Sequence, residues 1–329
     1  MFFLSFLPSL AVFLVSLIVL SKASHTVLKS VINLSKHLGI GEFAVAFILV
    51  SVATSLPELM VSVMAGLSGN TGIILGNVIG SNITNKLLVL GVVAFLQGIP
   101  VTQKAMSQNA GILFIISLIP LLLIQRNSIG LIEGIVLISI FFAYAFIVSK
   151  MKISLEMPKH VFRNPDVVKL LVQKLEWFSH MVLDIILFCV GMVFVIGASY
   201  FMIQEATTIA LAMNLSETVI GLTVVALGTS LPELSIAVVA VIKKHKSIAL
   251  GEILGSSIVN LTLVLGAGAV LAPISIEFNA IGPAITLMII VTLYLWFALN
   301  KYHNLGKKTG ILFLLAYALF ILSQTAGLL

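Results

Sequence analysis

Long apolar segments alternate with short polar interruptions along the whole sequence. Each segment is long enough for a helix to cross a lipid bilayer, which takes about 20 residues. The first segment lacks a basic leader and a small-residue cleavage site, so we expect it to remain as a span rather than be removed as a signal peptide. We predict ten spans, at residues 3–21, 41–67, 72–97, 106–124, 129–149, 178–212, 217–242, 247–271, 279–299 and 309–327.

The composition agrees with this pattern. Of 329 residues, 60% are hydrophobic and only 9% are charged, and the mean hydropathy is +1.21. An ordinary soluble domain has about 25% charged residues. The single cysteine, Cys189, excludes an internal disulfide and a thiolate metal cluster, and the six histidines are scattered and offer no metal site. The chain is therefore expected to be an all-α integral membrane protein.

The basic residues are divided unequally between the two sides of the predicted spans. Sixteen lysines and arginines fall on one side, and only Arg126 falls on the other. Because the basic side of a membrane protein faces the cytoplasm, we expect both termini outside, a cytoplasmic basic linker at 150–177, and a location in the plasma membrane. Topology and contact with the lipid bilayer account for the net charge of +6, so we expect no nucleic-acid partner and no obligatory protein partner.

One part of the sequence occurs twice, with a shift of 175 residues. Val50–Gly91 aligns with Val225–Gly266 without a gap, and twenty of the 42 positions are identical. The matches cluster in T-S-L-P-E-L, at 54–59 and 229–234, and in G-x-x-x-G-S-x-I-x-N, at 76–85 and 251–260. Shared hydrophobicity gives scattered matches of Leu and Val, but not Thr, Ser, Pro, Glu and Asn in one register. The two segments are therefore copies of one motif.

The two copies are predicted to cross the membrane in opposite directions, because five spans, an odd number, separate them. Inverted repeats are typical of secondary transporters, whose substrates bind near the midplane on interrupted helices. We therefore predict two inverted five-helix repeats, 1–149 and 178–329, joined by the linker 150–177, with the second and seventh helices broken.

Each copy places a proline and a carboxylate about midway along a span. Ser55-Leu-Pro-Glu58 fits a capping box, so each motif is expected to start a half-helix inside the bilayer. Proline has no N–H and clashes with the carbonyl four residues earlier, which frees the carbonyls of Ala53 and Gly228. Free carbonyls in hydrocarbon must be satisfied inside the protein, and a cation does so. Glu58 and Glu233 follow directly.

The second block of the motif supplies further oxygen atoms. Ser81 and Asn85 are four residues apart and share one helix face, as do Ser256 and Asn260. All the converging groups are hard oxygen donors, which suit Ca²⁺ and Na⁺ rather than Zn²⁺ or Cu⁺. The predicted metal ligands are Glu58, Glu233, Asn85, Asn260, Thr54, Ser55, Ser81, Thr229, Ser230 and Ser256, with the carbonyls of Ala53 and Gly228.

A purely structural role is the alternative for these residues. Glu58 and Glu233 would then only cap helices, although a cap can use Gln without charging the membrane interior. The serine and asparagine residues of the second block would form hydrogen bonds between helices, a common use of such residues in membranes.

At these motifs the sequence resembles the calcium/cation antiporter superfamily, and within it the sodium/calcium exchangers of prokaryotic type, whose paired α-repeats carry T-S-x-P-E and G-S-x-x-x-N. The resemblance covers 46–92 and 221–267. It implies ten helices, no cofactor, and exchange of Na⁺ for Ca²⁺ by alternating access, with the first and sixth spans sliding past the others. It also implies that Glu58 and Glu233 are the central Ca²⁺-binding carboxylates, and that Asn85, Asn260 and the Thr and Ser residues complete adjacent Na⁺ sites.

The sequence departs from the family's pattern at three positions. Some prokaryotic members have Asp where this chain has Asn260, Glu252 stands opposite Asn77, and Lys86 lies near the middle of the third span. One hypothesis is that Glu252, one turn before Ser256, either replaces the missing acid or pairs with Lys86 across the repeat interface. The alternative is that Glu252 reaches the lipid interface and Lys86 extends its ammonium group to water.

Three other functions are compared with Na⁺/Ca²⁺ exchange. Two neighbouring carboxylates in a low dielectric repel each other, so one of them can carry a proton, which gives Ca²⁺/H⁺ or other cation exchange through the same glutamates. The proton-coupled branch usually reads G-N-A-T-E in place of T-S-L-P-E, which favours sodium. A channel with the same oxygens is disfavoured by the inverted broken helices. We expect no enzyme, because no acidic metal-diphosphate motif, nucleophile elbow or HExxH is present.

Overall fold

The computed structural model describes residues 7–38, 45–67, 71–100, 104–119, 128–150, 167–212, 226–275, 278–301 and 304–325. Arg126, most of the predicted linker and the beginnings of the predicted second and seventh spans lie outside the described residues.

Five described helical stretches are long and apolar enough to cross a membrane. A sixth results if Ala46–Thr54 and Leu56–Leu67, which meet at an angle of 45°, form one broken span. Each of the six overlaps a predicted span, and the total of ten stays a prediction. The five stretches are Ile74–Gln97, Leu131–Val148, Phe178–Ala198, Lys246–Leu271 and Ile281–Lys301.

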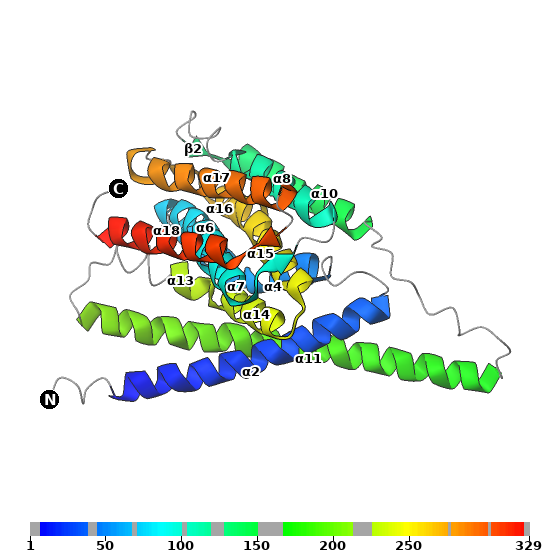
Figure 1. Ribbon diagram of the computed structural model, residues 1–329. Helices are drawn as coiled ribbons and strands as arrows, with labels where there is room; N and C mark the ends of the chain where they lie inside the picture. The colour runs from blue at the N-terminus through cyan, green and yellow to red at the C-terminus, as the bar shows by residue number, and fades with distance from the viewer. Residues whose placement is uncertain are drawn as a thin grey trace.

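The helices fall into two groups (Figure 1). Helices α2 (Leu7–Leu38) and α11 (Val167–Ala212) lie side by side and antiparallel along one side of the molecule, and we term them the long pair. The remaining elements stack against the long pair and are termed the block. The helices of the block are η1 (Ala46–Val50), α4 (Ser51–Thr54), α5 (Leu56–Leu67), α6 (Thr71–Thr84), η2 (Asn85–Val89), α7 (Leu90–Gln97), α8 (Lys104–Ser117), α10 (Leu131–Lys150), α13 (Ala226–Thr229), α14 (Leu231–Ile242), α15 (Lys246–Val259), η4 (Asn260–Val264), α16 (Leu265–Leu271), α17 (Phe278–Lys301) and α18 (Lys307–Thr325).

Both helices of the long pair extend beyond the predicted boundaries. Helix α2 continues to Leu38, whereas the first span was predicted to end at residue 21. The extension is amphipathic, because its buried apolar residues recur every three or four positions. These are Ala23, Val27, Val31 and Leu34, and the opposite face carries the exposed Lys22, Lys29 and Lys36. Helix α11 begins at Val167, inside the segment predicted as a linker.

Two short antiparallel ribbons connect distant parts of the block. Strand β1 (Ile99–Pro100) pairs with β4 (Asn304–Leu305), and β2 (Ser128–Ile129) pairs with β3 (Ile274–Ser275). Strands β1 and β3 are separated by 175 residues, and β2 and β4 by 176. Each ribbon therefore joins a segment before residue 150 to one after residue 177, and the second ribbon repeats the first.

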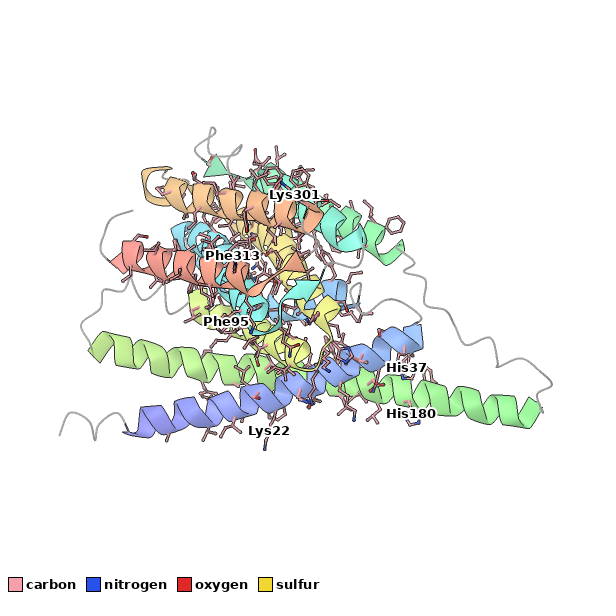
Figure 2. The ribbon with its side chains drawn as sticks, in the orientation of Figure 1. Lys22, His37, Phe95, His180, Lys301 and Phe313 are labelled. Carbon is pink, nitrogen blue, oxygen red and sulfur yellow. The ribbon has the colours of Figure 1, made fainter. Side chains whose placement is uncertain are left out.

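Two close contacts between helices at glycine residues are related by the same separation of 175 or 176 residues. A Cβ atom on Gly134 of α10 would lie 2.8 Å from the carbonyl oxygen of Gly266 in α16, and the reverse distance is also 2.8 Å. Gly91 of α7 and Gly310 of α18 form the equivalent contact, with 2.7 Å between a Cβ on Gly310 and the carbonyl oxygen of Gly91. The likeness between the two parts of the chain thus extends beyond the residues that align in sequence. Figure 2 places Phe95 of α7 and Phe313 of α18 in this region of the block.

Candidate cation-binding site

Both T-S-L-P-E-L segments interrupt a helix, as predicted. Helix α4 ends at Thr54 and α5 begins at Leu56, with Ser55 at φ −80° and ψ 7° between them. Helix α13 ends at Thr229 and α14 begins at Leu231, with Ser230 at φ −89° and ψ 6°. Ala53 and Gly228 therefore lie in the last turn before each break, four residues before a proline that offers no N–H to their carbonyls.

The capping box that the sequence suggested is not formed in either copy. The side chain of Ser230 makes no capping hydrogen bond. The hydroxyls of Ser55 and Ser230 and all four carboxylate oxygens of Glu58 and Glu233 are buried and have no hydrogen-bond partner among the described residues. The interpretation of these residues as helix caps is therefore wrong, because a capping box would satisfy both groups.

The second block forms a helix with an irregular turn at the same place in both copies. Asn85 begins the π-helical turn η2 between α6 and α7, and Asn260 begins η4 between α15 and α16. Single π-helical turns inside α-helices often occur at functional sites. No local signal in the sequence predicts these turns, because apolar periodicity over five residues does not separate a π turn from an α turn.

The two copies meet by crossing each other. Helix α15 of the second copy packs against η1 and α4 of the first, and α6 of the first packs against α13 of the second. Gly255 permits the first contact, since a Cβ there would lie 2.7 Å from the carbonyl oxygen of Phe47 and 2.7 Å from Cβ of Ser51. The equivalent Gly80 faces Ala226. The crossing brings the broken helix of each copy to the second block of the other.

Hydroxyl groups surround the two buried carboxylates. Those of Thr229, Ser81 and Ser230 lie beside Glu58, and that of Thr54 lies beside Glu233. Each carboxylate thus faces hydroxyls from the opposite copy. None of these groups reaches hydrogen-bond geometry with the carboxylates, and all are at most 3% exposed. These hydroxyls and carboxylates therefore form a buried cluster of oxygen atoms where the two copies cross.

In the second block, some asparagine and serine atoms form hydrogen bonds between or within helices, and others are buried without a partner. Asn85 donates from Nδ2 to Oγ of Ser256 at 3.0 Å, and Ser256 donates to the carbonyl of Ile253 at 3.3 Å. Hydrogen bonding between helices therefore accounts for part of this set. Oδ1 of Asn85, Oγ of Ser81 and both amide atoms of Asn260 are buried without a hydrogen-bond partner among the described residues.

Two expectations for Glu252 and Lys86 are wrong: that they extend to the membrane surface, and that they pair with each other. Both side chains are 0% exposed, so neither reaches the membrane surface. Lys86 donates to Oδ1 of Asn82 at 2.9 Å, and Glu252 accepts from Oγ1 of Thr54 at 3.3 Å. Between these two described side chains there is no ion pair. Lys86 turns to its own helix because Asn82 lies one turn away on the same face.

Some buried polar groups of the site were not predicted. Ser62 is fully buried on α5, one turn after Glu58, and its hydroxyl has no hydrogen-bond partner among the described residues. Ser62 lies four residues after Glu58, and this spacing indicates that the two side chains share one helix face. The comparison of the two copies did not reveal Ser62, because Ala237 stands at the equivalent position. Ser257 has a similarly buried and unpartnered hydroxyl.

A cation site at this crossing would need neutral oxygens as well as carboxylates. Within the described ranges, no three acidic, histidine or cysteine side chains lie close enough together to hold a metal ion by themselves. Two carboxylates combined with hydroxyl and amide oxygens form the donor set that Ca²⁺ and Na⁺ accept.

A family model described as sodium/calcium exchanger protein matches residues 8–150 and 183–326. The chain belongs to this family, and it is accordingly a multi-pass membrane transporter.

Individual relatives match over nearly the whole chain. The putative antiporter CaxA of Alkalimonas amylolytica is 29% identical over 314 residues, which cover 92% of this chain and 94% of CaxA. The sodium/calcium exchanger MaX1 of Methanosarcina acetivorans is 29% identical over 341 residues, which cover 94% and 96% of the two chains. A structure of the sodium-calcium exchanger NCX_Mj, soaked with Na⁺ and Sr²⁺, has a TM-score of 0.81 and 29% identity, covering 97% of this chain and 99% of that one.

Proposed function

We propose that this protein exchanges Na⁺ for Ca²⁺ by alternating access, with the ions bound between the two crossed copies of the motif. One observation carries the proposal. The carboxylates of Glu58 and Glu233 are completely buried, and their four oxygens have no hydrogen-bond partner among the described residues. A buried charge without a partner costs several kcal/mol, and a bound cation removes that cost.

The residues of the site take different parts in this proposal. Glu58 and Glu233 bind Ca²⁺ between them, because two carboxylates together balance the charge of a divalent ion. Ca²⁺ takes six to eight oxygens in a flexible arrangement, so neutral groups must complete its shell and form adjacent Na⁺ sites. These groups are Thr54, Ser55, Ser81, Asn85, Thr229, Ser230, Ser256 and Asn260, with the carbonyls of Ala53 and Gly228.

The proposed framework is ten transmembrane helices arranged as two inverted five-helix repeats, 1–149 and 178–329. The two equivalent ribbons and the equivalent glycine contacts support it, because each relates a feature of the first repeat to one of the second. In this framework the termini face outwards, the 150–177 segment faces the cytoplasm, and the protein lies in the plasma membrane.

Proton-coupled exchange is the second candidate, and it is favoured by the same buried carboxylates without hydrogen-bond partners. A carboxylate without a hydrogen-bond partner is also stabilised by taking up a proton, so one glutamate can alternate between a proton and a cation. The two candidates differ only in the ion that returns.

Flux measurements separate the candidates. The purified protein is reconstituted into liposomes, and ⁴⁵Ca²⁺ uptake is driven by an outward Na⁺ gradient with the pH clamped on both sides. We expect Na⁺-dependent uptake that falls at least tenfold in Glu58→Gln and in Glu233→Gln, because each change removes one of the two charges opposite Ca²⁺. Uptake that ignores Na⁺ and requires a proton gradient would support the second candidate.

The control for this experiment is Glu133→Gln. The Glu133 carboxylate accepts from the backbone N–H of Gly130 at 3.0 Å at the start of α10, so the substitution changes the same chemical group outside the proposed site. Equal losses in all three variants would contradict the special role of Glu58 and Glu233.

A further inference from the structure

Glu252 is a third fully buried carboxylate near the site. It lies on α15, in the turn before Gly255, where this helix crosses η1 and α4. It is 0% exposed, and it lies close enough to Glu58 and Glu233 for the three negative charges to repel one another. The equivalent position of the first copy is Asn77, which carries no charge.

The two equivalent side chains make different contacts. Asn77 donates from Nδ2 to the backbone carbonyl of Glu58 at 3.2 Å and so steadies the start of α5. An ionised glutamate cannot donate such a hydrogen bond. Glu252 instead accepts from Thr54 at 3.3 Å, in the broken helix of the other copy, while its Oε2 has no hydrogen-bond partner among the described residues. Its role therefore differs from the structural role of Asn77.

Lys86 does not neutralise this third carboxylate. Its ammonium group is bound to Asn82, one turn away on its own helix. A third negative charge in the interior, close to two others, is costly unless positive charge is bound nearby. Among the described side chains no Lys, Arg or His pairs with Glu252, so a transported cation can supply this charge, as can a proton.

We infer that Glu252 and Thr54 form an additional acidic subsite for a hard cation, present in one half of the protein and absent from the other. This inference rests on the proposed function. The subsite binds through oxygen only, which suits Na⁺ or Ca²⁺. It makes the pathway asymmetric, since an ion moving between the copies meets three carboxylates rather than two. Glu252 thereby raises cation affinity without being one of the two central ligands.

The test compares Glu252→Gln, which removes the charge, with Glu252→Asp, which keeps it. Two quantities are measured: Ca²⁺ binding to the detergent-solubilised protein by equilibrium dialysis with ⁴⁵Ca²⁺, and the Ca²⁺ concentration that gives half-maximal Na⁺-driven uptake in liposomes. We expect Glu252→Gln to weaken Ca²⁺ binding and to raise the half-maximal concentration by about tenfold or more, with exchange retained. Glu252→Asp should stay within about threefold of the wild type.

Each outcome decides the inference. Unchanged Ca²⁺ binding in Glu252→Gln would overturn it, and so would equal losses in the Gln and Asp variants, which would indicate packing rather than charge. Glu133→Gln serves again as the control outside the site. If the wild type shows no Na⁺-dependent uptake, the proposed function fails, and the dialysis measurement still decides whether Glu252 binds a cation.

Discussion

The long pair and the block are held together by different kinds of contact. In the block, helices approach until backbone meets backbone, as at Gly134 and Gly266, and two ribbons join its ends. The long pair is in extensive contact with itself, and α2 meets the block mainly along α14. One such contact is the 2.6 Å hydrogen bond between the hydroxyls of Ser24 and Ser235. The exposed face of α11 is apolar around Val193, as expected of a surface in lipid, whereas α2 exposes Lys22, Lys29 and Lys36.

This difference indicates where the protein can change shape. Close-packed interiors do not deform continuously, so rearrangement occurs at boundaries that have two discrete arrangements. The block holds both copies of the motif and has little room to rearrange. We therefore propose that alternating access takes place by sliding of the long pair along the block, at the boundary that includes Ser24 and Ser235.

A covalent link across this boundary is expected to have the largest effect. In a Cys189→Ser background, Ser24→Cys with Ser235→Cys places two thiols where the hydroxyls now touch, which suits disulfide formation. Oxidation should lower Na⁺-driven ⁴⁵Ca²⁺ uptake at least tenfold, and reduction should restore it. The single-cysteine variants under the same oxidant are the controls. Full uptake in a fully cross-linked sample would show that the boundary does not move.

Three glycine-to-alanine variants compare the packing of the two regions. Gly134→Ala should reduce stability by about 1–3 kcal/mol, because its Cβ meets backbone. Gly191→Ala on α11 should cost less, since its nearest obstacle is the side-chain methyl Cγ2 of Val27 at 2.8 Å. Gly197→Ala meets nothing within 4 Å and should gain about 0.5–1 kcal/mol from helix propensity. Thermal unfolding in detergent measures all three, and a reversed order would contradict the comparison.

A smaller effect is expected from Lys86→Leu, which copies the residue at the equivalent position, Leu261. Lys86 is buried in the block but bonded to Asn82 rather than to a carboxylate. A buried charge without an ionised partner costs several kcal/mol, so an apolar residue of similar size should be neutral or stabilising here. We expect the Ca²⁺ dependence of uptake to stay within twofold. A tenfold change would place Lys86 among the residues that control the bound ions.

The smallest effect is expected within the long pair itself. Asp184 of α11 accepts from Asn33 at 3.0 Å and pairs with His37 at 3.2 Å, both on α2. Figure 2 shows His37 near the C-terminal end of α2, beside α11. The side chains of His37 and Asp184 are only 20% and 10% exposed, but an asparagine at 184 can still accept from Asn33 and donate to a neutral His37, so both contacts persist as neutral hydrogen bonds worth about 1 kcal/mol each. Asp184→Asn should therefore lower the unfolding free energy by less than about 1 kcal/mol. A loss of several kcal/mol, or of uptake, would show that this contact holds the pair in register.

Much of the architecture followed from two simple patterns in the sequence. Apolar length predicted the membrane helices, and the position of Pro57 and Pro232 predicted the breaks, since proline has the same local effect in any surroundings. The extension of α2 was missed because a search for continuous apolar runs passes over an amphipathic helix.

The site was only partly predictable. The repeat identified residues that share one identity in both copies, such as Glu58 and Glu233, and their burial follows from their depth. It gave no warning about positions where the copies differ, such as Ser62 and Glu252. Whether Glu252 meets Lys86 or Thr54 depends on the crossing of helices far apart in the sequence, which local patterns do not contain.

The π-helical turns at Asn85 and Asn260 have a consequence beyond their own amides. Each holds one more residue than an α-helical path needs, and an extra residue rotates everything after it by about 100° around the axis. Gly91 and Gly266 lie just after these turns, and it is this rotation that aims them at α18 and α10. Deleting a single residue within either turn would therefore swing the glycine away from its neighbour and bring the next side chain, Val92 or Ala267, to its place. One inserted residue per copy sets both the direction of a buried asparagine and the fit of a distant helix contact.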